Sequence, residues 1–248
     1  MSRDERAPLA DQLSGVPPVI TEGELELLGL LPNSSNYTFL ARATLGPERA
    51  LAVYKPRRGE TPLWDFPEGT LCRREAAAFV VARSLGWPNV PPTVLREGPE
   101  GKGSVQLFVD ADVREHYFTL QERPELADAF RRIAVFDVIV NNADRKSGHC
   151  LLGRDDTIWV VDHGVCFNVE DKLRTVIWEF VGEPMPPGSE DDLRRIRAEI
   201  DGGPLGNALA TLLADDEVAA FADRIDAILA VGVLPEPGEH RPFPWPPV

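Results

Sequence analysis

The sequence predicts an α+β fold in which a strand-rich first half is followed by a helical second half. Short runs with alternating apolar residues fill much of the first 110 positions, and one alanine-rich helical segment interrupts them. After Asp110 the apolar residues recur mainly at helical spacing. With 248 residues, the chain is long enough for one large domain or for two small lobes that share a cleft.

In the first half, the runs YTFLARATL and RALAVYKP predict a hairpin that ends at Lys55, within a region of β-prone runs from about residue 20 to 55. The alanine-rich segment over residues 72–86 predicts a helix that ends at Gly86. The runs VPPTVL and GSVQLFVD predict two further strands, because the turn-rich stretch REGPEGKG separates them. We therefore expect a small sheet with one helix.

In the second half, the segment RPELADAFRRIAVFDVIVNN predicts a long helix that ends near its two asparagines. The runs HCLLG and TIWVVDHG predict a short hairpin. Further helices are predicted within 169–181, 189–201 and 215–231. The two ends are predicted to be a flexible polar tail over residues 1–17 and a proline-rich tail over residues 235–248.

The composition argues against several classes of protein. There are 40 acidic and 26 basic residues, and the net charge of −14 disfavours binding to nucleic acid or to an anionic membrane surface. The three cysteines lack a Cys-x-x-Cys spacing, so neither a disulfide framework nor a zinc site is indicated. No apolar stretch approaches the roughly 20 residues of a membrane span. We expect a cytoplasmic protein with no stable membrane insertion.

Asp144 and Asp162 lie at the two ends of the predicted short hairpin. Two carboxylates in such positions can face one cleft, where one orients a hydroxyl group and the other holds a divalent ion on phosphate oxygens. Phosphates also need a cation, and Lys55 at the end of its strand is the candidate. Glu75 on the following helix is placed to position the Lys55 ammonium group. These four residues predict phosphoryl transfer.

The order of these residues resembles that of the protein-kinase-like superfamily: a strand lysine, a helix glutamate, a catalytic aspartate, an ion ligand five positions later, and Asp-x-Gly after a strand. More narrowly, the chain resembles the phosphatidylinositol 3/4-kinase family, and the type II phosphatidylinositol 4-kinases most of all. The similar segments, which span roughly residues 31–168, are NSSNYTFLAR, AVYKP, GSVQLFVD, FDVIVNNADRKSGHCLL and VVDHGVCF. The resemblance implies a two-lobed protein-kinase-like fold, with a β-rich N-lobe over residues 18–110 and a reduced helical C-lobe over residues 111–234.

The resemblance also implies a role for each residue of the motifs. Asp144 would orient or deprotonate the acceptor hydroxyl group, Arg145 would support the catalytic loop, and Asp162 would bind the metal. Lys55, paired with Glu75, would contact the ATP phosphates. The remaining residues implied to bind ATP are Ser34 and Ser35, which would cover the phosphates, and Gln106, Leu107, Phe108 and Val109, which would face the adenine.

This chain departs from the family at the second metal ligand. Five residues after the catalytic aspartate the family has an asparagine, and here that position is His149. Imidazole suits Mn²⁺ better than Mg²⁺, which prefers oxygen ligands, so His149 and Asp162 predict a site that favours Mn²⁺. The chain also lacks a glycine-rich phosphate loop, and the cysteine cluster and basic surface of a type II lipid enzyme are absent from the sequence.

The sequence therefore predicts an ATP-dependent, metal-assisted phosphotransferase that acts on a hydroxyl acceptor. The acceptor is left open among a lipid, a protein and a small molecule, and a further protein partner is also left open. The alternative is a pseudokinase, a nucleotide-binding or interaction module without phosphoryl transfer, which His149 favours and the other motif residues oppose. Taken singly, each motif residue has an ordinary structural explanation, and only their joint order points to a nucleotide site.

Overall fold

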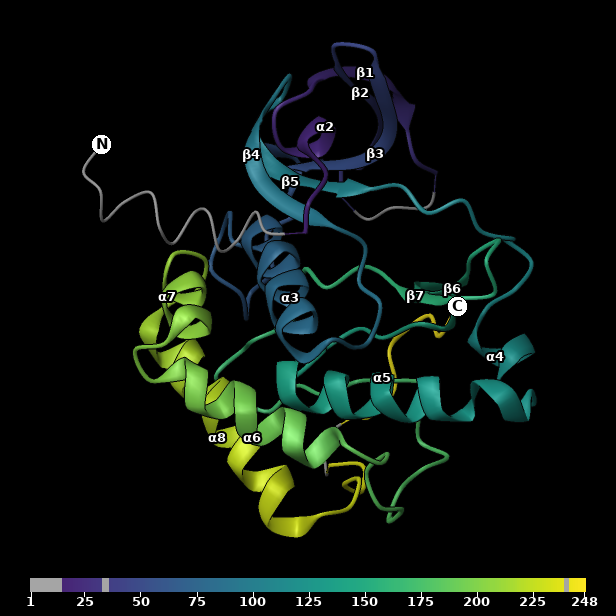
Figure 1. The fold of residues 1–248 in the computed structure, drawn as a ribbon, viewed down its shortest axis with the longest axis vertical. Helices are drawn as coiled ribbons and strands as arrows, with labels where there is room; N and C mark the ends of the chain where they lie inside the picture. Colours follow the sequence, from purple (N-terminus) through teal and green to yellow (C-terminus); the bar gives the residue numbers. More distant parts are fainter. Residues whose placement is uncertain (1–14, 33–35, 239–240) are drawn as a thin grey trace.

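A computed structural model describes residues 15–32, 36–238 and 241–248. The fold is α+β, as the sequence predicts. A curled antiparallel sheet forms one end of the molecule, most of the helices form the other, and one long helix lies between them (Figure 1). None of the helices in the described ranges is both long and apolar enough to span a membrane.

The sheet has five strands in the order β1-β2-β3-β5-β4, and every neighbouring pair is antiparallel. It curls around the short helix α2 (Pro18–Thr21) (Figure 1). The predicted hairpin and the two further strands are confirmed, and the first strand falls in the region predicted only as β-prone. The strands are β1 (Glu24–Leu30), β2 (Phe39–Leu45), β3 (Glu48–Pro56), β4 (Thr93–Gly98) and β5 (Gly101–Leu107).

The helix between the two ends is α3 (Leu71–Leu85), and it confirms the helix predicted over residues 72–86. Gly86 ends it in the left-handed conformation, with φ 84°, and the Gly86 amide donates to the Ala82 carbonyl oxygen at 2.8 Å. Most of the helix is buried, and its alanines let it pack closely against β4 and β5 as well as against helices of the other end.

The helical part confirms the predicted helix before the two asparagines, the predicted short hairpin and the two last predicted helices. Two short helices, α4 (Tyr117–Leu120) and α7 (Pro204–Ala210), were not predicted. The other elements are α5 (Ala127–Val140), β6 (Cys150–Leu152), β7 (Ile158–Val160), α6 (Ser189–Ile200) and α8 (Asp215–Val231).

The helix predicted within residues 169–181 is wrong, because this segment has no helix in the structure. Its backbone instead bonds to the loop after α5: Arg145 N donates to Arg174 O at 3.0 Å, and Val176 N donates to Arg145 O at 3.1 Å. The amides at the centre of the segment, those of Arg174, Thr175 and Val176, bond distant partners and not carbonyl groups of a helical turn. Tertiary pairing has therefore overridden the local helical pattern.

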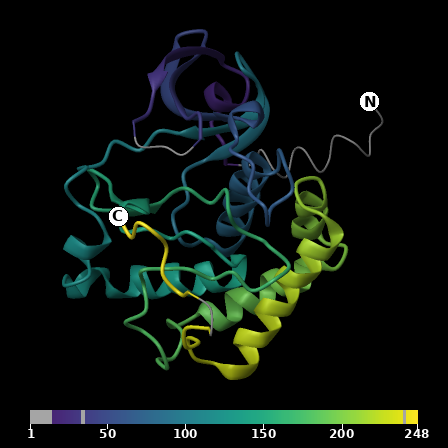
Figure 2. The ribbon, with the colours of Figure 1, turned by 180° about the vertical axis from the view of Figure 1, so that it is seen from behind.

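The segment over residues 241–248 lies across this same region. Pro242 O accepts hydrogen bonds from Thr175 N at 3.0 Å and from Trp178 Nε1 at 3.2 Å, and Pro247 O accepts one from Ser147 N at 2.9 Å. Seen from behind, the segment runs from the helical part towards the β6–β7 hairpin (Figure 2). Backbone carbonyl groups make these contacts, while the side chains of Phe243 and Trp245 are largely exposed.

We predict that deletion of residues 241–248 lowers the free energy of unfolding by about 1–3 kcal/mol, because three buried or half-buried donors lose their acceptors. Urea denaturation of the shortened and full chains measures the difference. The double substitution of Phe243 and Trp245 by Ala is the control, since it removes exposed rings and leaves the carbonyl groups in place. Equal stability of the shortened and full chains would contradict the prediction.

Candidate functional site

Lys55 stands between two carboxylates that come from different parts of the chain. Its Nζ donates to Asp162 Oδ1 at 2.8 Å and also to the carboxylate of Glu75. Lys55 ends β3, Glu75 lies on α3, and Asp162 follows β7, at 107 positions from Lys55. The structure thus brings together three of the residues that the sequence singled out.

The charges of this group are mutually dependent. Burial would lower the pKa of Lys55, but the attraction of Asp162 and Glu75 outweighs burial and raises it. In turn, Lys55 holds the pKa of Asp162 well below its ordinary range, although burial opposes this. Half of the Asp162 side chain is exposed, and its backbone adopts the left-handed conformation with φ 63°, which is uncommon outside glycine. Asp162 is therefore an ionised carboxylate open to a ligand.

Glu75 is positioned by a hydrogen bond of its own and by the contacts that its neighbour Arg74 makes with the helical part. Glu75 Oε2 accepts a hydrogen bond from His163 N at 3.0 Å. The preceding residue, Arg74, is buried and faces the helical part, where its Nη1 donates to Cys166 O at 2.5 Å and its Nη2 pairs with the carboxylate of Glu217 on α8. The buried ion pair of Arg74 and Glu217 thus fastens α3, the helix that carries Glu75, to the helical part.

A second buried network shapes the loop that carries Asp144. Arg145 is fully buried; its Nε donates to Asp137 Oδ2 at 2.9 Å and its Nη1 to Val161 O at 2.9 Å. Asp144 N donates to Asn142 Oδ1 at 3.0 Å, and Asn142 in turn donates to Asp137. Arg145 thus lies beneath the surface, where its contacts hold the loop.

The same network fixes the protonation of His163. Arg145 Nη2 lies 2.8 Å from His163 Nε2, and a guanidinium group only donates, so Nε2 is the acceptor and Nδ1 carries the proton. Burial holds the pKa of His163 well below its ordinary value, and nearby Arg145 lowers it further. His163 is therefore a neutral structural residue under the site, packed edge-on against Phe136.

Asp144 is a partly buried carboxyl group with a raised pKa. Burial raises its pKa to about 6, the nearby carboxylate of Asp162 adds to the rise, and Lys146 opposes it. Lys146 Nζ lies 3.4 Å from Asp144 Oδ2. Lys146 is not among the residues predicted from the sequence, although its place two residues after Asp144 was a usable signal. Together they put a proton acceptor and a cation side by side.

His149 lies beside Asp162, with its Nε2 at 3.3 Å from Asp162 Oδ2. Burial lowers the pKa of His149 to about 4, so the ring is neutral. Its Nδ1 accepts a hydrogen bond from Lys146 N at 3.3 Å, which places the proton on Nε2, facing Asp162. Metal ligation through Nε2 requires this proton to move to Nδ1 and the bond to Lys146 N to be given up.

The donor set fits a divalent ion that is shared with phosphates. Within the described residues there is no group of three or more His, Cys, Asp or Glu side chains placed to hold a metal. Asp162 and, after the tautomer change, His149 would supply two ligands. Mg²⁺ and related ions at phosphate sites commonly take only one or two carboxylates from the protein and complete their shell with water and phosphate oxygens.

In the segment predicted to face the adenine, several hydrogen-bonding groups already have partners within the protein. Leu107 N donates to Pro92 O at 2.8 Å, and Phe108 N donates to Leu51 O at 2.9 Å. The Gln106 side chain is buried and donates to Thr93 Oγ1 at 2.8 Å. A base bound here would therefore use carbonyl oxygens of this segment and the Val109 amide. Ser34 and Ser35, predicted to cover the phosphates, lie outside the described residues.

Comparison with known proteins places this chain in a family. No family model matches it. Protein Rv2133c of Mycobacterium tuberculosis is 41% identical over 263 residues, a match that covers 92% of this chain and 94% of that protein. The chain belongs to the family of Protein Rv2133c.

More distant relatives come from plants. Phosphatidylinositol 4-kinase gamma 4 of Oryza sativa subsp. japonica is 29% identical over 161 residues, and the enzyme of the same name from Arabidopsis thaliana is 26% identical over 163 residues. Both matches cover 54% of this chain, but only 27% and 28% of the plant proteins. The similarity is thus confined to about a quarter of each plant protein.

A solved structure shows the fold. The Helicobacter pylori proinflammatory kinase CtkA is 14% identical, with a TM-score of 0.55, and the match covers 86% of this chain and 94% of that one. The fold is therefore the two-lobed, kinase-like one that the sequence resemblance implied, with a β-rich N-lobe and a reduced helical C-lobe.

We predict that Arg74→Met lowers the free energy of unfolding by about 3 kcal/mol, because it leaves the Glu217 carboxylate unpaired in a largely buried place. The additional substitution Glu217→Met should restore part of the loss, since no lone charge then remains. Urea denaturation provides the measurement, and Arg73→Met on the same helix is the matched control. If Arg74→Met lowered the free energy of unfolding no more than Arg73→Met does, the buried pair would not be what fastens α3.

We predict that Asp144→Asn stabilises the fold at neutral pH. The raised pKa means that the ionised carboxylate is unfavourable in the folded state, and its removal should add about 1–2 kcal/mol after allowance for partial exposure. The gain should shrink as the pH falls from about 6 towards 4, because the folded wild-type protein then takes up the proton. Urea denaturation of both proteins across this pH range tests the prediction, which a pH-independent difference would contradict.

Proposed function

We propose that this protein transfers the γ-phosphate of ATP to a hydroxyl acceptor, with the help of a divalent metal ion. The observation that carries the proposal is the position of Lys55 between Glu75 and Asp162, since a partly buried cation beside an open, ionised carboxylate suits a metal–phosphate ligand. ATP would supply the phosphoryl group, and the metal ion would neutralise part of the charge of its phosphates. The protein residues position it.

Lys55 and Asp162 would separate when the nucleotide binds. The Lys55 ammonium group would keep Glu75 as its anchor and turn its remaining donors to the phosphate oxygens, while Asp162 would bind the metal. This exchange replaces one opposite-charge contact by two others, so the buried charges stay compensated. Rate enhancement would then come mostly from positioning and from electrostatic stabilisation.

Asp144 would accept the proton of the acceptor hydroxyl group. The acceptor oxygen forms a bond to the γ-phosphorus, the bond from that phosphorus to the bridging oxygen breaks, and ADP leaves with the electron pair. A carboxylate with a pKa near 6 is a better proton acceptor at neutral pH than an ordinary aspartate. Lys146 would stabilise the negative charge on the transferring group.

The proposal leaves the class of acceptor open among a lipid, a protein and a small molecule. The plant relatives are named as phosphatidylinositol 4-kinases, which supports an affinity to the phosphatidylinositol 3/4-kinase family and a lipid acceptor. The narrower affinity to the type II members rests on the sequence motifs alone. The net charge of −14 favours a protein or small-molecule acceptor instead, since it disfavours an anionic membrane. Incubation of the protein with labelled ATP and separate pools of lipids, peptides and metabolites divides the three.

The testing experiment is calorimetric titration of ATP with Mn²⁺, with Mg²⁺ and with a chelator. We expect metal-dependent binding that Asp162→Asn abolishes, and Asp144→Asn should keep the binding while it lowers phosphoryl transfer by about 100-fold or more. If His149 ligates the metal, Mn²⁺ should give the tighter complex, and His149→Asn should remove that preference.

The outcomes separate the proposal from its alternative. Binding without transfer to any acceptor pool would favour the pseudokinase. Absence of binding with either metal would overturn the nucleotide site itself. Equal or tighter binding with Mg²⁺ would refute only the predicted preference for Mn²⁺.

A further inference from the structure

Arg174 is a cation beside Asp144 that the proposed reaction does not use. In that reaction Lys55 serves the nucleotide phosphates and Lys146 the transferring group. Arg174 acts electrostatically on Asp144, whose pKa it lowers against the effect of burial. Its side chain is half-buried, and its guanidinium group has no hydrogen-bond or ion-pair partner among the residues that the structure describes. Arg174 is thus a charge available to a ligand.

Backbone hydrogen bonds on both sides of Asp144 fix the position of Arg174. Arg174 N donates to Asn142 O at 2.9 Å, and Arg145 N donates to Arg174 O at 3.0 Å. Asn142 precedes Asp144 by two residues and Arg145 follows it directly, so the backbone of Arg174 runs alongside the loop at Asp144. The next residue, Thr175, forms a parallel bridge with Arg145. The backbone alone therefore anchors Arg174 here, and its guanidinium group is not needed for the fold.

The backbone amides around Asp144 are all engaged within the protein. Every amide over residues 141–147 donates a hydrogen bond to another group of the chain, and so does every amide over residues 172–177. Two of these bonds go to the segment over residues 241–248, from Ser147 N and Thr175 N. A peptide that binds in extended form pairs its main chain with free backbone groups of its host. Since these two segments leave no amide free, an acceptor beside Asp144 has to be held by side chains.

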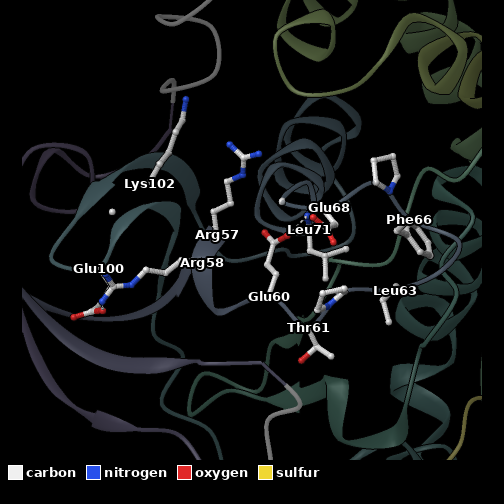
Figure 3. Close-up of a pocket in the computed structure, with 14 residues that line it drawn as sticks. Arg57, Arg58, Glu60, Thr61, Leu63, Phe66, Glu68, Leu71, Glu100 and Lys102 are labelled. Atoms are coloured by element: carbon white, nitrogen blue, oxygen red, sulfur yellow. Dashed lines mark hydrogen bonds and ion pairs between the residues drawn. The ribbon is translucent and has the colours of Figure 1, made fainter.

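The pocket of about 580 Å³ between the β3–α3 loop and the β4–β5 turn offers no comparable free cation (Figure 3). Neither Asp144 nor Arg174 belongs to its described lining. Its charges are balanced, because three basic and three acidic residues line it: Arg57, Arg58, Lys102, Glu60, Glu68 and Glu100. This pocket therefore shows no preference for an anion, and it is not where an acceptor hydroxyl group would meet Asp144.

We propose that the acceptor is a small, soluble alcohol with a phosphate or carboxylate group, which Arg174 binds while the hydroxyl group meets Asp144. The inference rests on the proposed function, since it names the acceptor of that reaction. A guanidinium group binds either anion through two parallel hydrogen bonds, which fix its orientation as well as its position. The anionic group keeps all its bonds. Only the hydroxyl group changes, because it loses its proton to Asp144 and gains the phosphoryl group.

The charge of the chain favours a small anion over an anionic lipid as the ligand of Arg174. At physiological salt, charges more than about 8 Å apart are largely screened from each other in water. A small anion at Arg174 therefore responds mainly to that guanidinium group and its near neighbours. A membrane surface meets a whole face of the protein, and the net charge of −14 opposes its approach when the lipids are anionic.

Transfer from labelled ATP to separate acceptor pools tests the proposal. One pool holds hydroxy acids with phosphorylated alcohols and sugars, a second their neutral counterparts, a third serine-containing peptides, and a fourth phosphatidylglycerol vesicles. We expect transfer to the first pool alone. For an acceptor from it, Arg174→Gln should raise the KM at least about tenfold and leave the KM of ATP unchanged, because hydrogen bonds to a charged group are lost. Arg174→Lys should recover part of the loss, since it keeps the charge but not the paired bonds.

Arg241→Gln is the matched control, because Arg241 is an exposed arginine next to Pro242, which bonds Thr175 N. It should leave both KM values unchanged. Transfer to neutral alcohols, peptides or vesicles instead of the first pool would overturn this inference and keep the proposed function. An acceptor KM that Arg174→Gln leaves unchanged would do the same.

Calorimetry separates the failure of this inference from the failure of the proposed function. Glycerol phosphate is titrated into the protein saturated with metal and a non-hydrolysable ATP analogue, with glycerol as the neutral probe. If no pool receives phosphate, the proposed function is overturned. Binding of glycerol phosphate that Arg174→Gln weakens would then still support an anion site at Arg174, whereas absence of binding would overturn that site too.

Discussion

The contact of Lys55 with two carboxylates is the interaction on which the rest of the arrangement depends. The sheet supplies the cation, α3 supplies Glu75, and the segment after β7 supplies Asp162. An ammonium group with only a fifth of its side chain exposed is costly without a partner, and so is the buried Glu75 carboxylate. The mutual compensation of these charges therefore joins the sheet, α3 and the segment after β7 at one point.

Helix α3 is joined to the helical lobe by directional contacts near both of its ends. Near its start Arg74 pairs with Glu217, and at its end Arg195 Nη1 donates to Ser84 O at 2.8 Å while Trp87 Nε1 donates to Asp192 Oδ2 at 2.8 Å. These contacts are directional. Towards the sheet, α3 makes the ion pair of Glu75 with Lys55 and packs against β4 and β5.

Much of this organisation could be predicted from the sequence, because local pattern decides it. Alternation gave the hairpin before Lys55, helical spacing gave the helix of Glu75, and the order of four charged residues pointed to one cleft. Contacts between distant residues could not be predicted in this way. The Arg74–Glu217 pair joins residues 143 positions apart, and the segment within 169–181 loses its helix to partners at Arg145 and Pro242. His149 shows the same limit, because only the bond to Lys146 N reveals its tautomer.

The backbone contacts of the segment over residues 241–248 have a consequence for the order of events during synthesis. Pro242 and Pro247 accept hydrogen bonds from Thr175 and Ser147, so the support of the Asp144 loop includes residues translated after every other part of the site. On the ribosome, the sheet, α3 and the helices can emerge and pack while this support is still missing. The loop therefore cannot complete its hydrogen bonding before residues 242 and 247 have been synthesised.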